Sequence, residues 1–132
     1  GAASNNDLDM VEEMRTAMLL QKVAQMNPSA VSAYDALAMA TINGARALGL
    51  DGEIGTLEVG KKADIAIISL WHPHFYPRTE QNDILSHLAY CAKAGDIHTV
   101  IVNGKVVVRD KKSLNIDEGK LYQQIQRRAK RL

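Results

Sequence analysis

The chain has 132 residues, of which 46% are hydrophobic and 23% charged, a balance typical of a globular protein with a core of its own. With 16 basic and 15 acidic residues, the net charge of +1 gives no overall field for nucleic acid or an anionic membrane, and we expect neither as a partner. No apolar stretch has the length of a membrane span, and the single Cys91 suits a reducing compartment, so we expect a cytoplasmic protein.

A helix is predicted from Asp9 onward, after a small polar loop at residues 1–6. Asp9 and Glu12 have the spacing of a capping box, in which two side chains satisfy the free amides at a helix start. Apolar residues then recur on one broad face, including the methionines at positions 10, 14 and 18. We interpret this methionine stripe as core packing and not as a cofactor site.

Two more helices are predicted before residue 50. One starts near Ser32, with Asp35 three residues later, and a separate short one covers residues 41–48. Gly49 stands where a helix commonly ends in a left-handed residue.

The segment 54–70 predicts a turn followed by a strand. Gly60 suits a positive φ, and Lys61-Lys62 are expected to keep the turn in water. Residues 65–68 form a short aliphatic run, which predicts a strand buried on both faces. Asp64 can bond nearby backbone and fix the angle at which the strand joins the sheet.

The remainder predicts an aromatic loop at 71–77, a helix at 83–92, a hairpin and a final helix from residue 117. The hairpin signal is Asn103-Gly104 between the apolar runs 98–102 and 105–109, because both residues tolerate the positive φ of a type I′ turn. The basic end of the last helix is interpreted as a solvated face, since no aromatic residues alternate with its charges.

No residue pattern in the chain predicts a catalytic site. His72-Pro-His74 has the form of a zinc-binding pair, but it lies in a proline-rich loop without further ligands at useful spacing, so we interpret it as structural. His87 and His98 fit no ligand pattern, and Cys91 lacks the paired groups that activate a nucleophile.

Three blocks, in their order along the chain, resemble the amidohydrolase superfamily: MATINGARALGL at 39–50, GTLEVGKKAD at 55–64 and TVIVNGKVVV at 99–108. The opening GAASNNDLDM at 1–10 resembles the branch of methylthioadenosine/S-adenosylhomocysteine deaminases and chlorohydrolases. The resemblance implies an α/β parent with a metal-dependent (β/α)₈ barrel and a composite β-sandwich. This chain would be α+β: residues 1–49 the last barrel loop and helices, and 50–132 the C-terminal part of the sandwich with a closing helix.

The resemblance also implies a function and two site residues. The parent would use zinc or iron to deaminate a purine nucleoside thioether or to hydrolyse a related ring substituent. In this branch the metal-binding aspartate immediately precedes the residue matching Gly1. We therefore expect this chain to be a piece of a longer enzyme, and we expect the piece itself to hold no cofactor, no metal ligand and no catalytic residue. Gly1 and Ser4 would face the substrate, and we expect a homo-oligomer. The alternatives are a stand-alone binding or oligomerisation domain and, less favoured, a nucleic-acid-binding domain.

Overall fold

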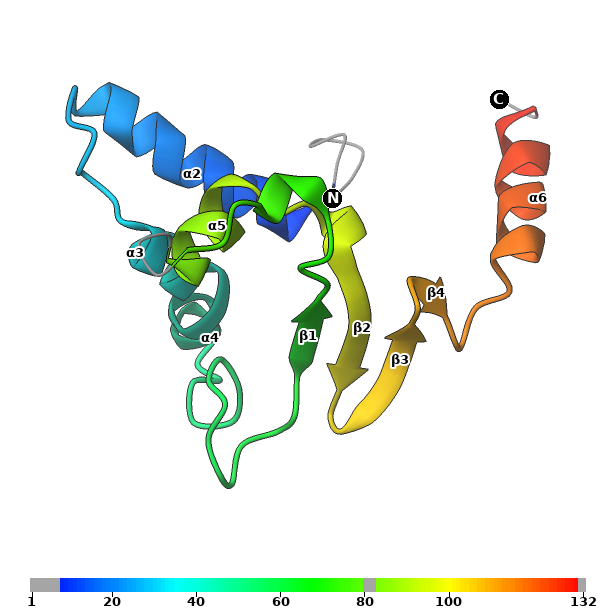
Figure 1. Cartoon of the computed structure of the whole chain (residues 1–132). Helices are drawn as coiled ribbons and strands as arrows, with labels where there is room; N and C mark the ends of the chain where they lie inside the picture. Colours follow the sequence, from blue (N-terminus) through cyan, green and yellow to red (C-terminus); the bar gives the residue numbers. More distant parts are fainter. Residues whose placement is uncertain (1–7, 80–82, 131–132) are drawn as a thin grey trace.

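The computed structural model describes residues 8–79 and 83–130 and has a helical part beside a four-stranded antiparallel sheet (Figure 1). The α-helices are α2 (Met10–Ala24), α3 (Ala33–Ala38), α4 (Gly44–Ala47), α5 (Ile84–Tyr90) and α6 (Glu118–Ala129). The strands are β1 (Ile65–Ile68), β2 (Ile97–Val102), β3 (Lys105–Arg109) and β4 (Lys112–Ser113). Short helical segments of other types are η1 (Met39–Asn43), η2 (Pro73–Phe75) and η3 (Ala94–Asp96). The chain is therefore α+β, as predicted.

Helix α2 supplies the core of the helical part. Its N-cap is Asp9, whose carboxylate accepts from the amides of Val11 and Glu12, so the predicted start is confirmed. Met14 and Met18 are buried against Ala36 and Ala89, with aliphatic side chains of α2, α3 and η1 packed around them. The interpretation of the methionine stripe as core is thus confirmed for these two. It is wrong for Met10, which is 63% exposed.

The predicted second and third helices form one continuous helical segment. Helix α3 begins with a capping box between Ser32 and Asp35, passes through the π-helical turn η1 and continues as α4. The expected break is absent because both residues that flank η1 keep α-helical backbone angles. Gly49 has φ +69° and donates to the Arg46 carbonyl, while the Leu50 amide bonds to Ala45, so the predicted left-handed ending is confirmed.

The Lys61 side chain lies within the loop between α4 and β1 and hydrogen-bonds to two of its residues. Its Nζ donates to the Asp51 carbonyl and to Thr56 Oγ1, both at 2.7 Å, and only 14% of the side chain is exposed. The expectation that both lysines stay in water is therefore wrong for Lys61, because loop oxygens replace its water. Gly60 has φ +96°, as predicted.

The sheet is a meander in the order β1-β2-β3-β4. Asn103 and Gly104 have φ +48° and +75°, which confirms the hairpin turn between β2 and β3. Asp64 Oδ1 accepts from the Asn103 amide at 2.6 Å, so the predicted backbone bond of Asp64 ties the start of β1 to that turn. Burial of β1 on both faces is contradicted, since Ala66 and Ile67 are exposed. Successive residues of a strand point to opposite faces of the sheet, so the described part of the chain leaves both faces of β1 partly uncovered.

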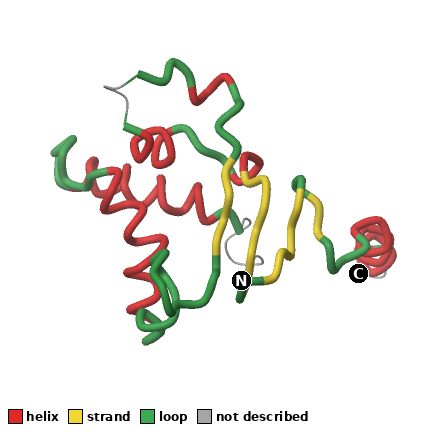
Figure 2. The backbone as a smooth tube through the Cα atoms, turned by 60° about the horizontal axis from the view of Figure 1, so that its bottom comes forward, coloured by secondary structure: helices red, strands yellow, loops and turns green. Residues whose placement is uncertain are grey.

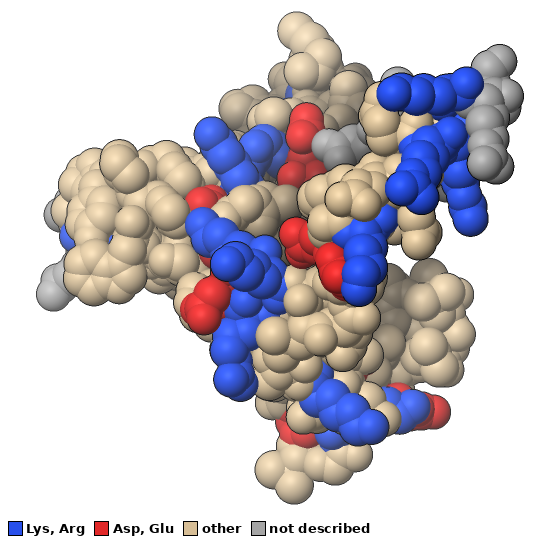
Figure 3. Space-filling model, turned by 90° about the vertical axis from the view of Figure 1, so that its right-hand side faces the viewer, with Lys and Arg blue, Asp and Glu red and all other residues tan. Residues whose placement is uncertain are grey.

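The far end of the sheet carries β4 and α6. Strand β4 was not predicted; it follows a tight turn in which Asp110 and Lys111 both have positive φ. Figures 1 and 2 show α6 beyond β3 and β4, on the side of the sheet away from the other helices. Figure 3 shows the molecule from the right-hand side of Figure 1, and on this face Lys and Arg side chains are mixed with Asp and Glu. None of the helices in the described ranges combines the length and apolar character needed to cross a membrane.

Candidate functional site

The predicted substrate-facing residues, Gly1 and Ser4, lie outside the described residues. The structure does describe the helix start that follows them in sequence, where Asp9 caps α2. Two segments bond to the first turns of this helix, the turn η3 and the end of α5, and the aromatic loop in turn contacts η3.

Asp96 is the central charged residue of these surroundings. Its side chain is only 6% exposed, and its Oδ2 accepts from the Lys93 amide at 2.9 Å and lies 2.8 Å from His74 Nε2. His72 Nε2 lies 3.6 Å from Oδ1, and the two imidazole rings are parallel with centroids 5.6 Å apart. The side chain of Phe75, which follows His74, is fully buried and anchors the loop.

The electrostatics of this cluster keep the Asp96 carboxylate charged. Burial raises the pKa of Asp96, but the hydrogen bonds from His74 and the Lys93 amide and the charges of His74 and His72 outweigh it, so the pKa lies below its ordinary value. The interpretation of His72 and His74 as structural residues agrees with this geometry. Asp96 itself was missed by the sequence analysis.

The N-terminal turn of α2 is attached to the same region. Asp9 Oδ1 caps the helix, and its Oδ2 accepts from the Ala94 amide at 3.4 Å. Two turns along, the Arg15 guanidinium donates to the carbonyls of Ala89 and Ala92 at the end of α5. A cation is favourable there, because free carbonyls make the end of a helix partly negative. Arg15 was also missed.

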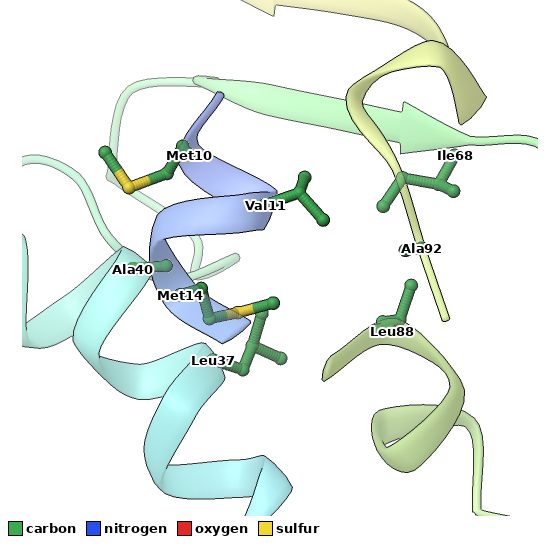
Figure 4. Close-up of a pocket in the computed structure, with 8 residues that line it drawn as sticks. All are labelled: Met10, Val11, Met14, Leu37, Ala40, Ile68, Leu88 and Ala92. Atoms are coloured by element: carbon green, nitrogen blue, oxygen red, sulfur yellow. The ribbon is translucent and has the colours of Figure 1, made fainter. Parts of the chain in front are cut away.

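A small apolar pocket adjoins the start of α2 (Figure 4). Its volume is about 100 Å³. Its lining comes from both parts of the molecule: Met10, Val11, Met14, Leu37, Ala40, Ile68, Leu88 and Ala92. Figure 4 shows Val11, Met14, Leu37 and Leu88 extending toward a common space between α2, α3 and α5. No lining residue carries a group for acid–base or nucleophilic chemistry, so the pocket can contribute only apolar contact.

The divalent metal that the resemblance implies does not fit the described residues. Among residues 8–79 and 83–130, no group of three or more His, Cys, Asp or Glu side chains could hold a metal ion. His72 and His74 both direct Nε2 toward the single Asp96 carboxylate, which leaves no converging set of three ligands. His98, two residues after Asp96, pairs instead with Asp110 across the hairpin at 2.7 Å.

The sequence matches one known protein family over most of its length. Residues 1–107 match the model of the family described as the amidohydrolase family. The chain belongs to the amidohydrolase family. This confirms the resemblance drawn from the three sequence blocks.

Close relatives within this family are deaminases. The chain is 52% identical over all 132 residues to a 5-methylthioadenosine/S-adenosylhomocysteine deaminase of Desulforudis audaxviator and covers 30% of that protein. It is 47% identical over 132 residues to a 5'-deoxyadenosine deaminase of Methanosarcina barkeri and covers 29% of it. The chain thus spans about 30% of the length of the curated relatives it matches.

Solved structures show the same local fold. An adenosine deaminase from Xanthomonas campestris with bound zinc superimposes with a TM-score of 0.93 at 36% identity, over 99% of this chain and 29% of that one. An atrazine chlorohydrolase from Arthrobacter aurescens TC1, complexed with zinc, gives a TM-score of 0.81 at 30% identity, over 94% of this chain and 27% of that one.

Proposed function

We propose that this chain is the C-terminal portion of a metal-dependent amidohydrolase that deaminates methylthioadenosine, S-adenosylhomocysteine or a similar purine nucleoside. The observation that carries this proposal is the 52% identity to a deaminase of that name across every residue of the chain. In the parent, residues 1–49 belong to the end of a (β/α)₈ barrel and residues 50–132 to a composite β-sandwich with its closing helix.

The proposed reaction replaces the amino group of the purine ring with the oxygen of water and releases ammonia. The zinc or iron required by such an enzyme is bound by the rest of the parent, as the resemblance to the deaminase and chlorohydrolase branch implies. The contribution of this chain is to position the substrate: Gly1 and Ser4 face the nucleoside. We further propose that the parent is cytoplasmic and homo-oligomeric and binds neither nucleic acid nor membrane.

A chlorohydrolase-like activity on a ring substituent is the second candidate. It is favoured by the TM-score of 0.81 to the atrazine chlorohydrolase, but identity to that enzyme is 30%, against 52% for the deaminase. A stand-alone binding domain has no comparable support. Deamination is therefore the better proposal.

The experiment is an assay of the full-length protein that contains this chain. Purified parent, loaded with zinc or iron, is incubated with methylthioadenosine, S-adenosylhomocysteine, 5'-deoxyadenosine and a chlorinated triazine, and ammonia and chloride are measured. Ammonia release from the nucleosides supports the proposal. Chloride release without ammonia establishes the second candidate. If neither ammonia nor chloride is released, both candidate activities are contradicted.

The role of Ser4 is tested in the same assay. Because Ser4 faces the substrate and the metal activates the water elsewhere, Ser4→Ala is expected to change the ratio of kcat/KM for methylthioadenosine over adenosine by about 10-fold, with metal content unchanged. An unchanged ratio together with loss of metal would show that Ser4 supports the metal site instead. Ser29→Ala, in the exposed turn after α2, is the control substitution.

A further inference from the structure

Helix α6 is an exposed helix with one apolar face. Every residue from 119 to 130 is exposed, and Figures 1 and 2 show the helix beyond β3 and β4, apart from the other helices. Its apolar face consists of Leu121, Tyr122 and Ile125, because positions three and four apart are neighbours on a helix. A helix of this length is marginally stable alone in water and depends on the packing of such a face. We therefore expect another element to cover it.

Opposite charges lie at the two ends of this apolar face. Glu118 precedes Leu121 by three positions and Arg128 follows Ile125 by three, so both charges lie in line with the face. The Oε1 atom of Glu118 accepts from the Ser113 amide at 3.2 Å, but neither Glu118 nor Arg128 has an ion-pair partner among the described residues. They cannot pair within their own helix, because ten residues of α-helix separate them by about 15 Å.

A second copy of α6, antiparallel to the first, supplies the missing partner for each charge. With Leu121 of one helix opposite Ile125 of the other, Glu118 of the first helix lies opposite Arg128 of the second. Two-fold symmetry repeats both contacts, so an acid faces a base at each end of the pair. A parallel pair would instead place Glu118 against Glu118 and Arg128 against Arg128, which is repulsive. Charge complementarity therefore favours the antiparallel arrangement.

We propose that α6 is a homodimer interface, in which the helices of two copies pack antiparallel through their apolar faces and pair Glu118 with Arg128 at both ends. A twelve-residue helix is about 18 Å long, so the contact is smaller than a standard interface of about 800 Å² per partner, and we expect micromolar affinity. This dimer gives an interface to the homo-oligomer named in the proposed function and rests on that part of it alone. It is separate from the contact of edge strand β1.

Charge reversal in the full-length protein tests the pairing. Glu118→Arg places like charges opposite each other at both ends of the antiparallel dimer, and so does Arg128→Glu. Because two attractive pairs become repulsive, we expect each variant alone to raise the dissociation constant of the dimer by about 10-fold. An equimolar mixture of the two variants should dimerise within about threefold of wild type, because an acid again faces a base at both ends of the heterodimer.

Arg127→Glu is the matched control for this charge change. Arg127 lies in the same last turn of α6, but it shares a face with Lys120, Gln123 and Gln124 and not with Ile125. It should leave the dissociation constant within about twofold of wild type, because exposed charges outside the contact contribute little.

Sedimentation velocity of the purified parent across the micromolar range measures each dissociation constant. In the mixture, Glu118→Arg carries a fluorescent label, and its sedimentation with unlabelled Arg128→Glu reports the heterodimer. Far-UV circular dichroism shows whether each variant keeps the helix content of wild type. If a charge variant loses helix, Ile125→Gln is used in its place, because it removes apolar contact while glutamine favours a helix; we expect it to weaken the dimer by about 10-fold.

A parent that stays monomeric across this range would overturn the proposal and assign the apolar face of α6 to another part of the parent or to a different protein. Equal dissociation constants for Arg127→Glu and Arg128→Glu would also overturn it, as would a mixture that forms no heterodimer, since the contact would then lie elsewhere. The test does not use ammonia release. A parent that dimerises in this way but releases no ammonia would contradict the deaminase and support the dimer.

Discussion

Asp96 shows how a single buried charge makes the fold depend on pH. A buried carboxylate is costly unless it is paired and hydrogen-bonded, and Asp96 has both kinds of partner: an amide and two imidazoles. Protonating it would remove the attraction to His72 and His74 while leaving the side chain buried. The charged form is therefore the one that the native structure stabilises.

The sign of the pH effect follows from the lowered pKa of Asp96. Its contribution to stability is fully present above the ordinary pKa of 3.8 and is lost as the pH falls through the lower pKa of the folded state. We expect the free energy of unfolding of the chain to drop as the pH falls below about 4, and to drop less in Asp96→Asn. Urea denaturation followed by the fluorescence of Trp71, the single tryptophan, measures this.

At pH 7, Asp96→Asn should lower the free energy of unfolding by about 2–3 kcal/mol, because the buried partners of Asp96 lose an acceptor. Asp110→Asn serves as the control, since the Asp110 side chain is 71% exposed and such pairs contribute little. A pH profile of Asp96→Asn that parallels wild type would assign the acid sensitivity to other carboxylates.

The loop between α4 and β1 depends on a close approach to the helix before it. A Cβ at Gly55 would lie 2.8 Å from Ala45 Cβ and 3.0 Å from Ile42 Cα, and Gly55 has φ +94°. Contacts of that length are prohibitive for ordinary side chains, and one of the two neighbours is backbone. Only glycine lets this loop pack on η1 and α4.

Gly55→Ala should therefore destabilise the chain by about 3–5 kcal/mol, from backbone strain and overpacking together. Gly60→Ala is the matched control, because Gly60 has φ +96° but open space around its Cβ direction. Gly60→Ala should lower the free energy of unfolding by about 1–2 kcal/mol, from backbone strain alone. Urea denaturation of both variants measures the difference; equal losses would show that the helix moves aside at no cost.

At the element scale, the sequence predicted the features whose chemistry is local. Asn103-Gly104, Gly49 and the cap at Asp9 each act on their own few residues, and each is confirmed. Strand β4 was missed because its turn, at Asp110-Lys111, contains no glycine. The role of Lys61 was misjudged because its acceptor at Asp51 lies 10 residues away.

For the whole molecule, the family was predictable and the site only in part. Gly1 and Ser4 stay predictions, since they lie outside the described residues. Asp96 and Arg15 were missed because their partners lie 22 and 74 or more residues away, with no motif to connect them. Such contacts are set by how the helical part meets the sheet, and no local pattern encodes that.

Apolar side chains are exposed at both ends of the described part of the molecule. Edge strand β1 exposes 47% of Ile67, and β2 ends in Val102, which is also 47% exposed. On α6, the side chains of Leu121, Tyr122 and Ile125 are 39%, 62% and 54% exposed. A strand edge with aliphatic side chains is a template for pairing with another chain.

We expect the isolated chain to self-associate through its sheet at micromolar concentration. Each large apolar side chain that becomes fully buried contributes about 1.5–3 kcal/mol, so covering a few of them outweighs part of the entropy lost on association. Sedimentation velocity measures the effect, and Ile67→Lys, which places a charge on the edge strand β1, should shift the chain toward monomer. Lys112→Glu, on β4 at the opposite edge, is the control for a change of charge alone. A compact monomer that unfolds in two states and binds no apolar dye would contradict this expectation, because the exposed aliphatic edge would then carry no measurable drive to associate.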